Sequence, residues 1–240
     1  MDDVSNLAKI PRVDILHLSR ITAVPEFHPE HGTFAPFPVY GFVIHHPDGP
    51  IVVDTGIGRH AGIDALYGHE SVDLIAELHR FAVDERDVQL IVNSHLHFDH
   101  CGQNHSLDAP ITVQRAELEA AQAPFYTVPE WAVVEPSRSR VIDGDVEVAP
   151  GITAMLTPGH TPGHQAIVIT ACNETVVIAA QCIFRATEWS TGVEANNLHD
   201  PTWRLAALES VGRLRALRPR RVFLSHDSTL SLAVGETQFE

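Results

Sequence analysis

The segment LIVNSHLHFDHCG, residues 90–102, places four side chains that can bind a metal within six residues: His95, His97, Asp99 and His100. Neutral imidazoles and a carboxylate are the ligand types that a borderline divalent ion such as Zn²⁺ prefers. Because side chains two residues apart face the same way in an extended chain, His95, His97 and Asp99 are expected to converge. Burying four hydrogen-bonding groups costs on the order of several kcal/mol unless something binds them. We therefore predict a metal site here rather than a chance run of polar residues.

Two further segments supply histidines that could complete this site. The segment TPGHTPGHQ, residues 157–165, places His160 in a Gly/Pro turn directly after a predicted strand. The segment FLSHD, residues 223–227, places His226 at the end of another. Loops at strand ends are where a rigid scaffold can direct side chains into a common site. The second histidine of the first segment, His164, is expected to be structural.

The elements that must position these residues are short strands and a few helices. The predicted strands are rich in Val and Ile and are bounded by Gly, Pro, Asp or Asn, and helical periodicity appears in three segments. Asp200 and Pro201 suit the start of the last helix. No linker divides the chain, so we predict one domain over residues 1–240, built of two packed sheets covered by helices. The predicted strands are residues 13–20, 39–46, 50–56, 88–94, 111–114, 139–150, 152–157, 165–170, 175–181 and 221–225, and the predicted helices are residues 72–82, 115–122 and 201–217.

The composition excludes several classes of protein. With 44% hydrophobic and 20% charged residues, the chain is not a disordered one. Its formal net charge of −15 argues against nucleic acid or an anionic membrane surface as a partner. No apolar run approaches the roughly 18 residues of a membrane span, and the first residues, MDDVSNLAKIPR, lack the order of a secretory signal. We therefore expect a cytoplasmic protein whose three cysteines are free thiols.

Several motifs together resemble those of a known family. HLHFDH, VDTG at residues 53–56, TPGHTPGH and the terminal SHD occur in the order and spacing typical of the metallo-β-lactamase superfamily. NSHLHFDHCGQN, PITVQRAELEAA and IDGDVEVAPGI are similar to the N-acyl homoserine lactonase branch. The resemblance implies an α+β fold, a four-layer αββα sandwich of two mixed β-sheets flanked by helices. It also implies a dinuclear metal site at one edge of the two sheets.

The resemblance also implies roles for individual residues. Two ions would share a water, lower its pKa and generate a hydroxide that attacks an ester, lactone or thioester carbonyl. Asp99 would in addition handle the proton that passes to the leaving group, and Asp54 would steady the HLHFDH loop from outside the ligand set. The implied ligands are His95, His97 and His160 for one metal and Asp99, His100 and His226 for the other.

Two positions depart from the family pattern. The family normally has an aspartate that bridges both metals after the predicted 175–181 strand, whereas this chain has Gln181, whose neutral amide is a poor bridge. Homoserine lactonases commonly have a tyrosine three residues later that donates a hydrogen bond to the lactone, whereas this chain has Phe184. A lost donor to a developing charge costs on the order of 3 kcal/mol of barrier. Tyr126 or a water is the expected substitute, and Phe184 and Tyr126 are expected to line the substrate pocket.

These features predict a metal-dependent hydrolase that opens an acyl-homoserine-lactone-like lactone, a quorum-quenching activity, or that cleaves a related carboxylic ester. The expected partner is a small-molecule substrate. The expected cofactor is a divalent metal, with zinc as the first candidate. Two ions per chain are expected, and one ion is the alternative because Gln181 replaces the bridging aspartate. Three alternatives stay open. They are a thioester hydrolase similar to glyoxalase II, an oxidoreductase similar to the single-iron persulfide dioxygenases, and a metal-binding protein with reduced catalysis. A homodimer is one of the oligomeric states left open.

Overall fold

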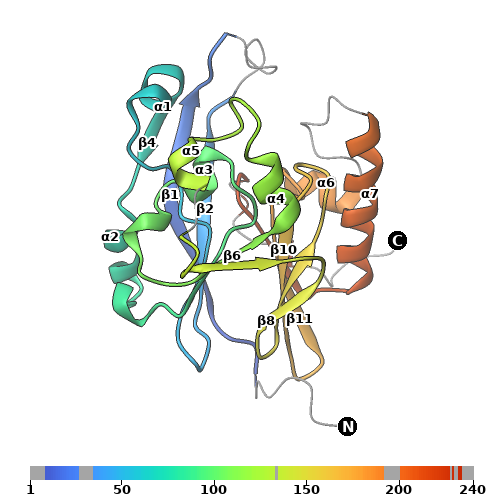
Figure 1. Ribbon diagram of the computed structural model, residues 1–240. Coiled ribbons are helices and arrows are strands. Elements are labelled where there is room, and N and C mark those ends of the chain that lie inside the picture. The colour runs from blue at the N-terminus through green and yellow to red at the C-terminus, as the bar shows by residue number, and fades with distance from the viewer. Residues whose placement is uncertain are drawn as a thin grey trace.

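Two mixed β-sheets packed face to face form the centre of the computed structural model (Figure 1), which describes residues 9–26, 35–132, 135–191, 201–227, 229 and 232–233. The first sheet consists of β1 (Val13–Ala23), β2 (Phe37–Ile44), β3 (Ile51–Val53), β4 (Gly68–Ser71), β5 (Leu90–Val92), β6 (Ile111–Gln114) and β7 (Ser139–Ile142). The second consists of β8 (Val146–Ala149), β9 (Ile152–Leu156), β10 (Gln165–Ala171), β11 (Glu174–Ala180), β12 (Arg221–Leu224) and β13 (Leu232–Ala233). The strand orders are β4-β1-β2-β3-β5-β6-β7 and β13-β12-β11-β10-β9-β8.

Helices cover the outer face of each sheet, as Figure 1 shows for α2 on one side and α7 on the other. The chain forms α1 (Ala61–Leu66), α2 (Leu74–Arg80), α3 (Phe98–Cys101), α4 (Arg115–Ala120), α5 (Pro129–Ala132), α6 (Ala186–Thr191) and α7 (Pro201–Ala216). Short 3-10 turns occupy Glu85–Asp87 and Asn104–Ser106. Within the described residues, no helix is both long and apolar enough to cross a membrane.

Alternation along the strands separates the cores of these layers. In β3, Ile51 and Val53 lie in the core between the two sheets. Val52, between them in the chain, packs instead with Leu74 and Leu78 of α2. On the other side of the sandwich, residues of α7 pack with the outward-facing residues of the second sheet. The order of layers is therefore helix, sheet, sheet and helix, which confirms the predicted αββα sandwich.

The predicted segment 139–150 is wrong as a single strand. It divides into β7 and β8, which belong to different sheets. The division falls at Asp143–Asp145, where Gly144 has a φ of +77°, a conformation that favours glycine. The chain therefore crosses from the first sheet to the second at this turn. The short elements β4 and α1 were not predicted, because four to six residues carry little periodicity.

Parallel pairing brings several strand ends to one edge of the sandwich. β3 and β5 are parallel, with Val53 opposite Val92, so the residues that follow both strands leave the first sheet at the same edge. In the second sheet, β9 and β11 are both antiparallel to β10, and β12 is parallel to β11. The chain therefore leaves β9, β11 and β12 at a common edge too.

Candidate metal centre

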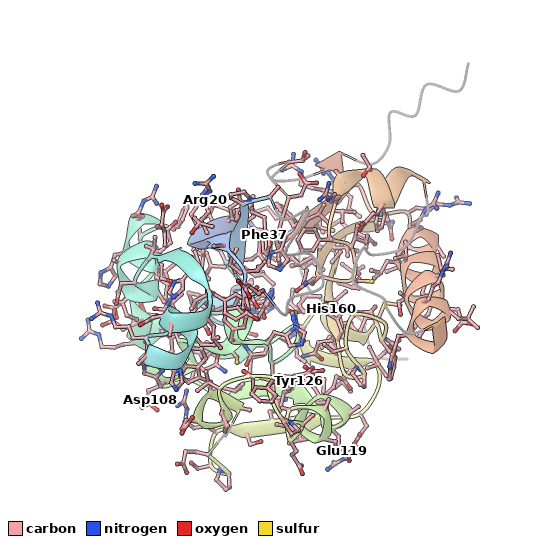
Figure 2. The ribbon with its side chains drawn as sticks, turned by 90° about the horizontal axis from the view of Figure 1, so that it is seen from above. Arg20, Phe37, Asp108, Glu119, Tyr126 and His160 are labelled. Atoms are coloured by element: carbon pink, nitrogen blue, oxygen red, sulfur yellow. The ribbon has the colours of Figure 1, made fainter. Side chains whose placement is uncertain are left out.

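Three histidines meet where the loops after β5 and β9 approach each other, and we call them the first group: His95, His97 and His160. Nδ1 of His97 lies 3.1 Å from Nε2 of His95 and 3.0 Å from Nε2 of His160. His95 is buried, whereas His97 and His160 are partly exposed. Figure 2, which looks onto this edge of the sandwich, shows His160 near the middle of the view with Tyr126 beside it.

A second group, Asp99, His100 and His226, lies beside the first and is buried. Nε2 of His100 lies 3.1 Å from Nε2 of His226, and Oδ2 of Asp99 lies 3.5 Å and 3.7 Å from those two nitrogens. In each group the three donor atoms all lie within 4.8 Å of one another. The structure thus brings together six residues from three distant segments, in the two groups that the family resemblance implies.

The alternation argument is wrong about Asp99. It assumed an extended chain through residue 99, but α3 begins at Phe98 and turns the backbone by helical steps. Asp99 therefore faces His100 and His226 instead of His95 and His97. This helix, bounded by His97 and Gly102, begins one residue before the segment DHCGQN, which is typical of a turn into a short helix.

Hydrogen bonds on the far side of each ring fix which nitrogen faces the centre. Nδ1 of His100 donates to Oδ2 of Asp54 at 2.8 Å, and Nδ1 of His226 donates to the carbonyl of Pro38 at 3.0 Å. Both rings therefore present Nε2 inward. Such outer partners orient metal-binding histidines in known sites.

Asp54 also holds the loop that carries His95. Its Oδ1 accepts the backbone N–H of Ser94 at 2.7 Å, and its Oδ2 accepts the Ser94 hydroxyl at 2.6 Å. The Ser94 hydroxyl in turn lies 3.0 Å from Nδ1 of His95. Asp54 adopts a φ of +59°, which is uncommon outside glycine. The arrangement agrees with the predicted supporting role of Asp54.

The charges of the two groups suit a cation. Burial lowers the pKa of His97 and His226 to about 4 and that of His95 and His160 well below the usual range, so these four rings are neutral at pH 7. Burial opposes ionisation of Asp99, but the neighbouring His100 outweighs it and holds the pKa of this carboxyl below its usual range. Neutral imidazoles and an ionised carboxylate are the states in which these side chains bind metals.

His100 differs from the other rings because it lies between two carboxylates. Burial lowers its pKa, but the charges of Asp99 and Asp54 prevail and raise it to about 10. A positive charge is therefore strongly favoured between Asp99 and the other donors of the second group. A divalent cation in contact with Nε2 would satisfy the same need while displacing this proton.

Gln181 belongs to the second group's surroundings. It directly follows β11, and its Oε1 lies 3.1 Å from Nε2 of His226. Since Nδ1 of His226 donates to Pro38, Nε2 offers a lone pair toward the oxygens of Gln181 and Asp99. In the metal-free state this lone pair also accepts from the protonated Nε2 of His100 at 3.1 Å. An imidazole nitrogen, an amide oxygen and a carboxylate are donor types that fit a divalent ion.

Phe184 packs against the ring of His226 and presents no polar group to the centre. Its ring is stacked on that of His226, and Phe37 meets both rings edge-on with centroids 5.1 Å away. The backbone N–H of Phe184 donates to buried Glu188 at 2.8 Å. These contacts form an apolar wall over the second group.

Tyr126 cannot replace the missing tyrosine as the sequence led us to expect. Its hydroxyl donates a short hydrogen bond to buried Glu117, while its ring packs against His97 at a centroid distance of 4.7 Å.

Tyr67, which the sequence analysis missed, lies with its ring 4.5 Å from that of Phe98. Burial and then the charge of Asp99 raise its pKa, and no hydrogen bond of its hydroxyl occurs among the described residues. No sequence pattern marks Tyr67, because a lone tyrosine between a short helix and a short strand belongs to no motif.

His164 has a supporting position, as predicted. Its Nδ1 lies 2.8 Å from the Thr157 hydroxyl, and its Nε2 accepts the backbone N–H of Gln181 at 3.3 Å. Cys101 and Cys182 are buried free thiols, and Cys172 is exposed. The proposed helix cap Asp200 lies outside the described residues.

Comparisons with known proteins identify the family of this chain. The model of the Metallo-beta-lactamase superfamily matches residues 35–226. An N-acyl homoserine lactonase from a Bacillus species is 31% identical over 214 residues, which cover 82% of this chain and 84% of the relative. N-acyl homoserine lactonase AiiA from Bacillus thuringiensis subsp. kurstaki is 30% identical over the same shares of the two chains.

Solved structures show the same relationship. The crystal structure of a quorum-quenching N-acyl homoserine lactone lactonase matches with a TM-score of 0.75 and 27% identity, covering 95% of each chain. An N-acyl homoserine lactone hydrolase with the product N-hexanoyl-L-homoserine bound at its catalytic metal center matches with a TM-score of 0.74 and 25% identity, covering 91% of this chain and 94% of that one. The chain is therefore an ester-hydrolysing enzyme that belongs to the metallo-β-lactamase superfamily, in its N-acyl homoserine lactonase-like branch.

Proposed function

We propose that this enzyme opens the ring of an N-acyl homoserine lactone or a closely related lactone. Each of the two groups would hold one divalent metal ion, for which zinc is the first candidate. The observation that carries the proposal is the convergence of six donor residues into two three-residue groups at one edge of the sandwich. The similarity to N-acyl homoserine lactonases supports the substrate class. Opening such a signal molecule would be a quorum-quenching activity.

The residues of this chain have distinct tasks in that reaction. A divalent ion, when bound, supplies Lewis acidity for the lactone carbonyl and lowers the pKa of water toward neutrality. His95, His97 and His160 offer neutral nitrogens on the more open side of the centre. On the buried side His226 offers a neutral nitrogen, and His100 would offer one once a bound ion displaces its proton. Asp54 and Pro38 keep the latter two rings in place.

Asp99 is the proposed proton carrier. Its carboxylate is nearly buried and ionised, so it can accept the proton released when water attacks the carbonyl carbon. As the ring C–O bond breaks, the leaving oxygen takes that proton, and the product is the ring-opened acyl homoserine. Phe184 and Phe37 would exclude bulk water from the buried side of the centre.

The test is acid release from N-hexanoyl homoserine lactone in a pH-stat, with protein loaded with zinc and with protein stripped by a chelator. Metal-dependent turnover is expected, and replacing His160 with alanine should abolish it. His79→Ala is the matched control, because His79 is exposed and pairs with Glu85 away from the centre. A zinc-loaded protein that turns over none of a panel of lactones and esters would overturn the proposal.

Gln181 favours a second candidate function, in which the centre holds a single metal ion, because its neutral amide is a poor bridge between two ions. Turnover of S-acyl glutathione would indicate a thioester hydrolase. One iron per chain with oxygen uptake would indicate an oxidoreductase of the persulfide dioxygenase type. Elemental analysis of protein purified without added metal separates the one-ion centre from the two-ion centre, which is the arrangement we propose.

A further inference from the structure

A buried carboxylate that is not in either group touches both loops of the first group. Glu117 lies in the first turn of α4 and is fully buried. Its Oε1 accepts the backbone N–H of Leu96 at 2.8 Å and a hydrogen bond from the Tyr126 hydroxyl. Its Oε2 accepts the Thr161 hydroxyl at 2.7 Å and the backbone N–H of Gly163 at 3.1 Å. Burial raises the pKa of this carboxyl, whereas these four hydrogen bonds lower it and so favour the ionised form. A carboxylate has about four acceptor positions, and four donors face this one.

Three of these four donors adjoin or contact a residue of the first group, and the fourth, Gly163, lies three residues after His160 in the same loop. Leu96 lies between His95 and His97 in the chain, and Thr161 directly follows His160. The ring of Tyr126 packs on His97. One carboxylate thus connects the loop after β5 with the loop after β9, which must meet if the three histidines are to share an ion.

The contact between Glu117 and the second of these loops is close. A Cβ atom on Gly163 would lie 2.2 Å from the backbone nitrogen of Glu117 and 2.5 Å from its Cβ. Real Cβ atoms do not approach backbone this closely, so glycine is required at this position. The loop that carries His160 is therefore seated directly on the start of α4.

A buried charge is a poor device for stability alone. Taking a carboxylate out of water has an effective cost of several kcal/mol, and apolar residues of similar volume often replace buried ion pairs at no loss of stability. What an apolar residue cannot do is accept four hydrogen bonds from two loops and a tyrosine. The chemistry of Glu117 therefore points to placement of those loops.

We infer that Glu117 is the positioning residue of the first group, holding His95, His97 and His160 at the separation that a metal ion requires. This inference rests on the proposed metal centre but not on the proposed substrate. The second group has a separate support, since Asp54 and Pro38 bind its two rings directly. Loss of the Glu117 carboxylate should therefore weaken metal binding by the first group and leave the second group nearly unchanged.

Glu117→Gln is the sharpest substitution. It keeps the shape, but its NH₂ group must replace one of the two oxygens. The Tyr126 and Thr161 hydroxyls can turn and accept from it, whereas the backbone N–H groups of Leu96 and Gly163 cannot. In either orientation of the amide, one backbone donor loses its acceptor and one loop must move.

The experiment measures zinc affinity by competition with a chromophoric chelator in two backgrounds. His226→Ala disables the second group and leaves the first, and His160→Ala does the reverse. In the first background Glu117→Gln should weaken zinc binding by about 10-fold to 100-fold, the range for partners of metal ligands. In the second background the change should be less than about twofold, because those ligands have other supports.

Two matched controls separate positioning from general destabilisation. Glu119→Gln alters an exposed carboxylate on the same helix, which Figure 2 shows at the rim of the view. Glu77→Gln alters another buried carboxylate, which accepts the backbone N–H of His17 at 3.0 Å in a remote layer. Neither should change zinc affinity in either background. If Glu117→Gln does not fold, Thr161→Val removes a single donor and should give a smaller loss confined to the first group.

Equal losses in both backgrounds, or none in the His226→Ala background, would overturn the inference. Such a result would leave the lactone proposal intact, because the titration does not depend on turnover. If neither background binds zinc at all, the metal centre itself fails, and the role of Glu117 fails with it.

Discussion

The ring of Phe184 lies stacked on the ring of His226, with centroids 5.0 Å apart and planes inclined by 26°. The position that commonly holds a hydrogen-bond donor in homoserine lactonases therefore holds an apolar cover over the second group. The enzyme must either forgo that donor or obtain it from elsewhere in the chain. Both outcomes can be tested by single substitutions.

Phe184→Tyr should raise kcat/KM for N-hexanoyl homoserine lactone. A donor to developing charge is worth up to on the order of 3 kcal/mol, so the gain should lie between a few-fold and about 100-fold. Steady-state kinetics with zinc-loaded protein measure it. Phe184→Leu is the control, since it removes the stacked ring without adding a donor and should not raise the rate. An unchanged rate for Phe184→Tyr would mean that this position does not face the lactone.

Tyr67→Phe should lower kcat, because Tyr67 is the candidate for the missing donor. Its ring packs on Phe98, the neighbour of Asp99, and its hydroxyl is not committed to another described residue. A fall of about 10-fold or more is expected for loss of one such donor, with zinc content unchanged. Tyr126→Phe is the contrast, since its hydroxyl is bound to Glu117 and its loss should affect zinc binding first. Unaltered kinetics in Tyr67→Phe would remove Tyr67 from the reaction.

Gln181→Asp should tighten zinc binding. The amide oxygen lies beside His226, and a carboxylate there adds one negative charge next to the cations. Charge-assisted contacts are roughly twice as strong as neutral ones, so a gain of at least about tenfold in affinity is expected. Chelator competition measures the gain, and Gln181→Glu tests whether the shorter side chain is needed. Weaker binding in Gln181→Asp would show that the position does not contact metal.

The stability of the metal-free protein should be greatest near pH 6.5. The folded-state pKa values of His97 and His226 are lowered by burial to about 4, and that of His164 to about 3, from 6.5. Below pH 6.5 the unfolded chain takes up protons that the folded chain refuses, so stability falls as the pH falls toward 4. His100 is shifted the other way, to about 10. Its contribution is present below pH 6.5 and is lost as the pH rises toward 10.

Urea denaturation of chelator-treated protein at a series of pH values measures how the free energy of unfolding depends on pH, with its expected maximum near pH 6.5. His100→Asn should remove the decline on the alkaline side while leaving the acid side in place. A stability that rose steadily from pH 6.5 to pH 9 would contradict the assignment of a protonated His100 in the metal-free state.

Gly163→Ala should be damaging where Gly212→Ala is not. The added methyl group at residue 163 would press into the backbone of Glu117, whereas nothing lies within 4 Å of a Cβ at Gly212. Overpacking of this kind costs about 1–3 kcal/mol, and an exposed helical Gly→Ala change stabilises by about 0.5–1 kcal/mol. Thermal and urea denaturation measure both. Equal stability of the two variants would contradict the close contact between α4 and the His160 loop.

Much of the fold could be predicted because its strands are chemically distinctive. β1, β2, β10 and β11 are runs of β-branched residues with clear boundaries, and each was expected within a few residues of where it lies. The boundary between β7 and β8 could not be predicted in the same way. Both flanks of Gly144 have strand composition, and only tertiary packing decides that they belong to different sheets.

The candidate site also contains residues that could be predicted from the sequence and residues that could not. Histidines in HLHFDH and in TPGH carry their chemistry in residue type and spacing, so their importance was readable from the sequence. Glu117 has no such signal, because one glutamate in RAELEA resembles any solvent-facing helical glutamate, and Glu119 in the same helix is in fact exposed. The role of Tyr126 was misjudged for the same reason, since its partner is 9 residues away in the chain and is revealed only by the fold.

Each group of candidate ligands draws from both sheets. In the first group, His95 and His97 follow β5 of one sheet and His160 follows β9 of the other; in the second group, His226 follows β12, opposite Asp99 and His100. A cation held by either group would act as a reversible cross-link between the halves of the sandwich, at one end only. Metal supply would then govern how readily proteases open that end, while the opposite end would keep the same resistance with or without the ion.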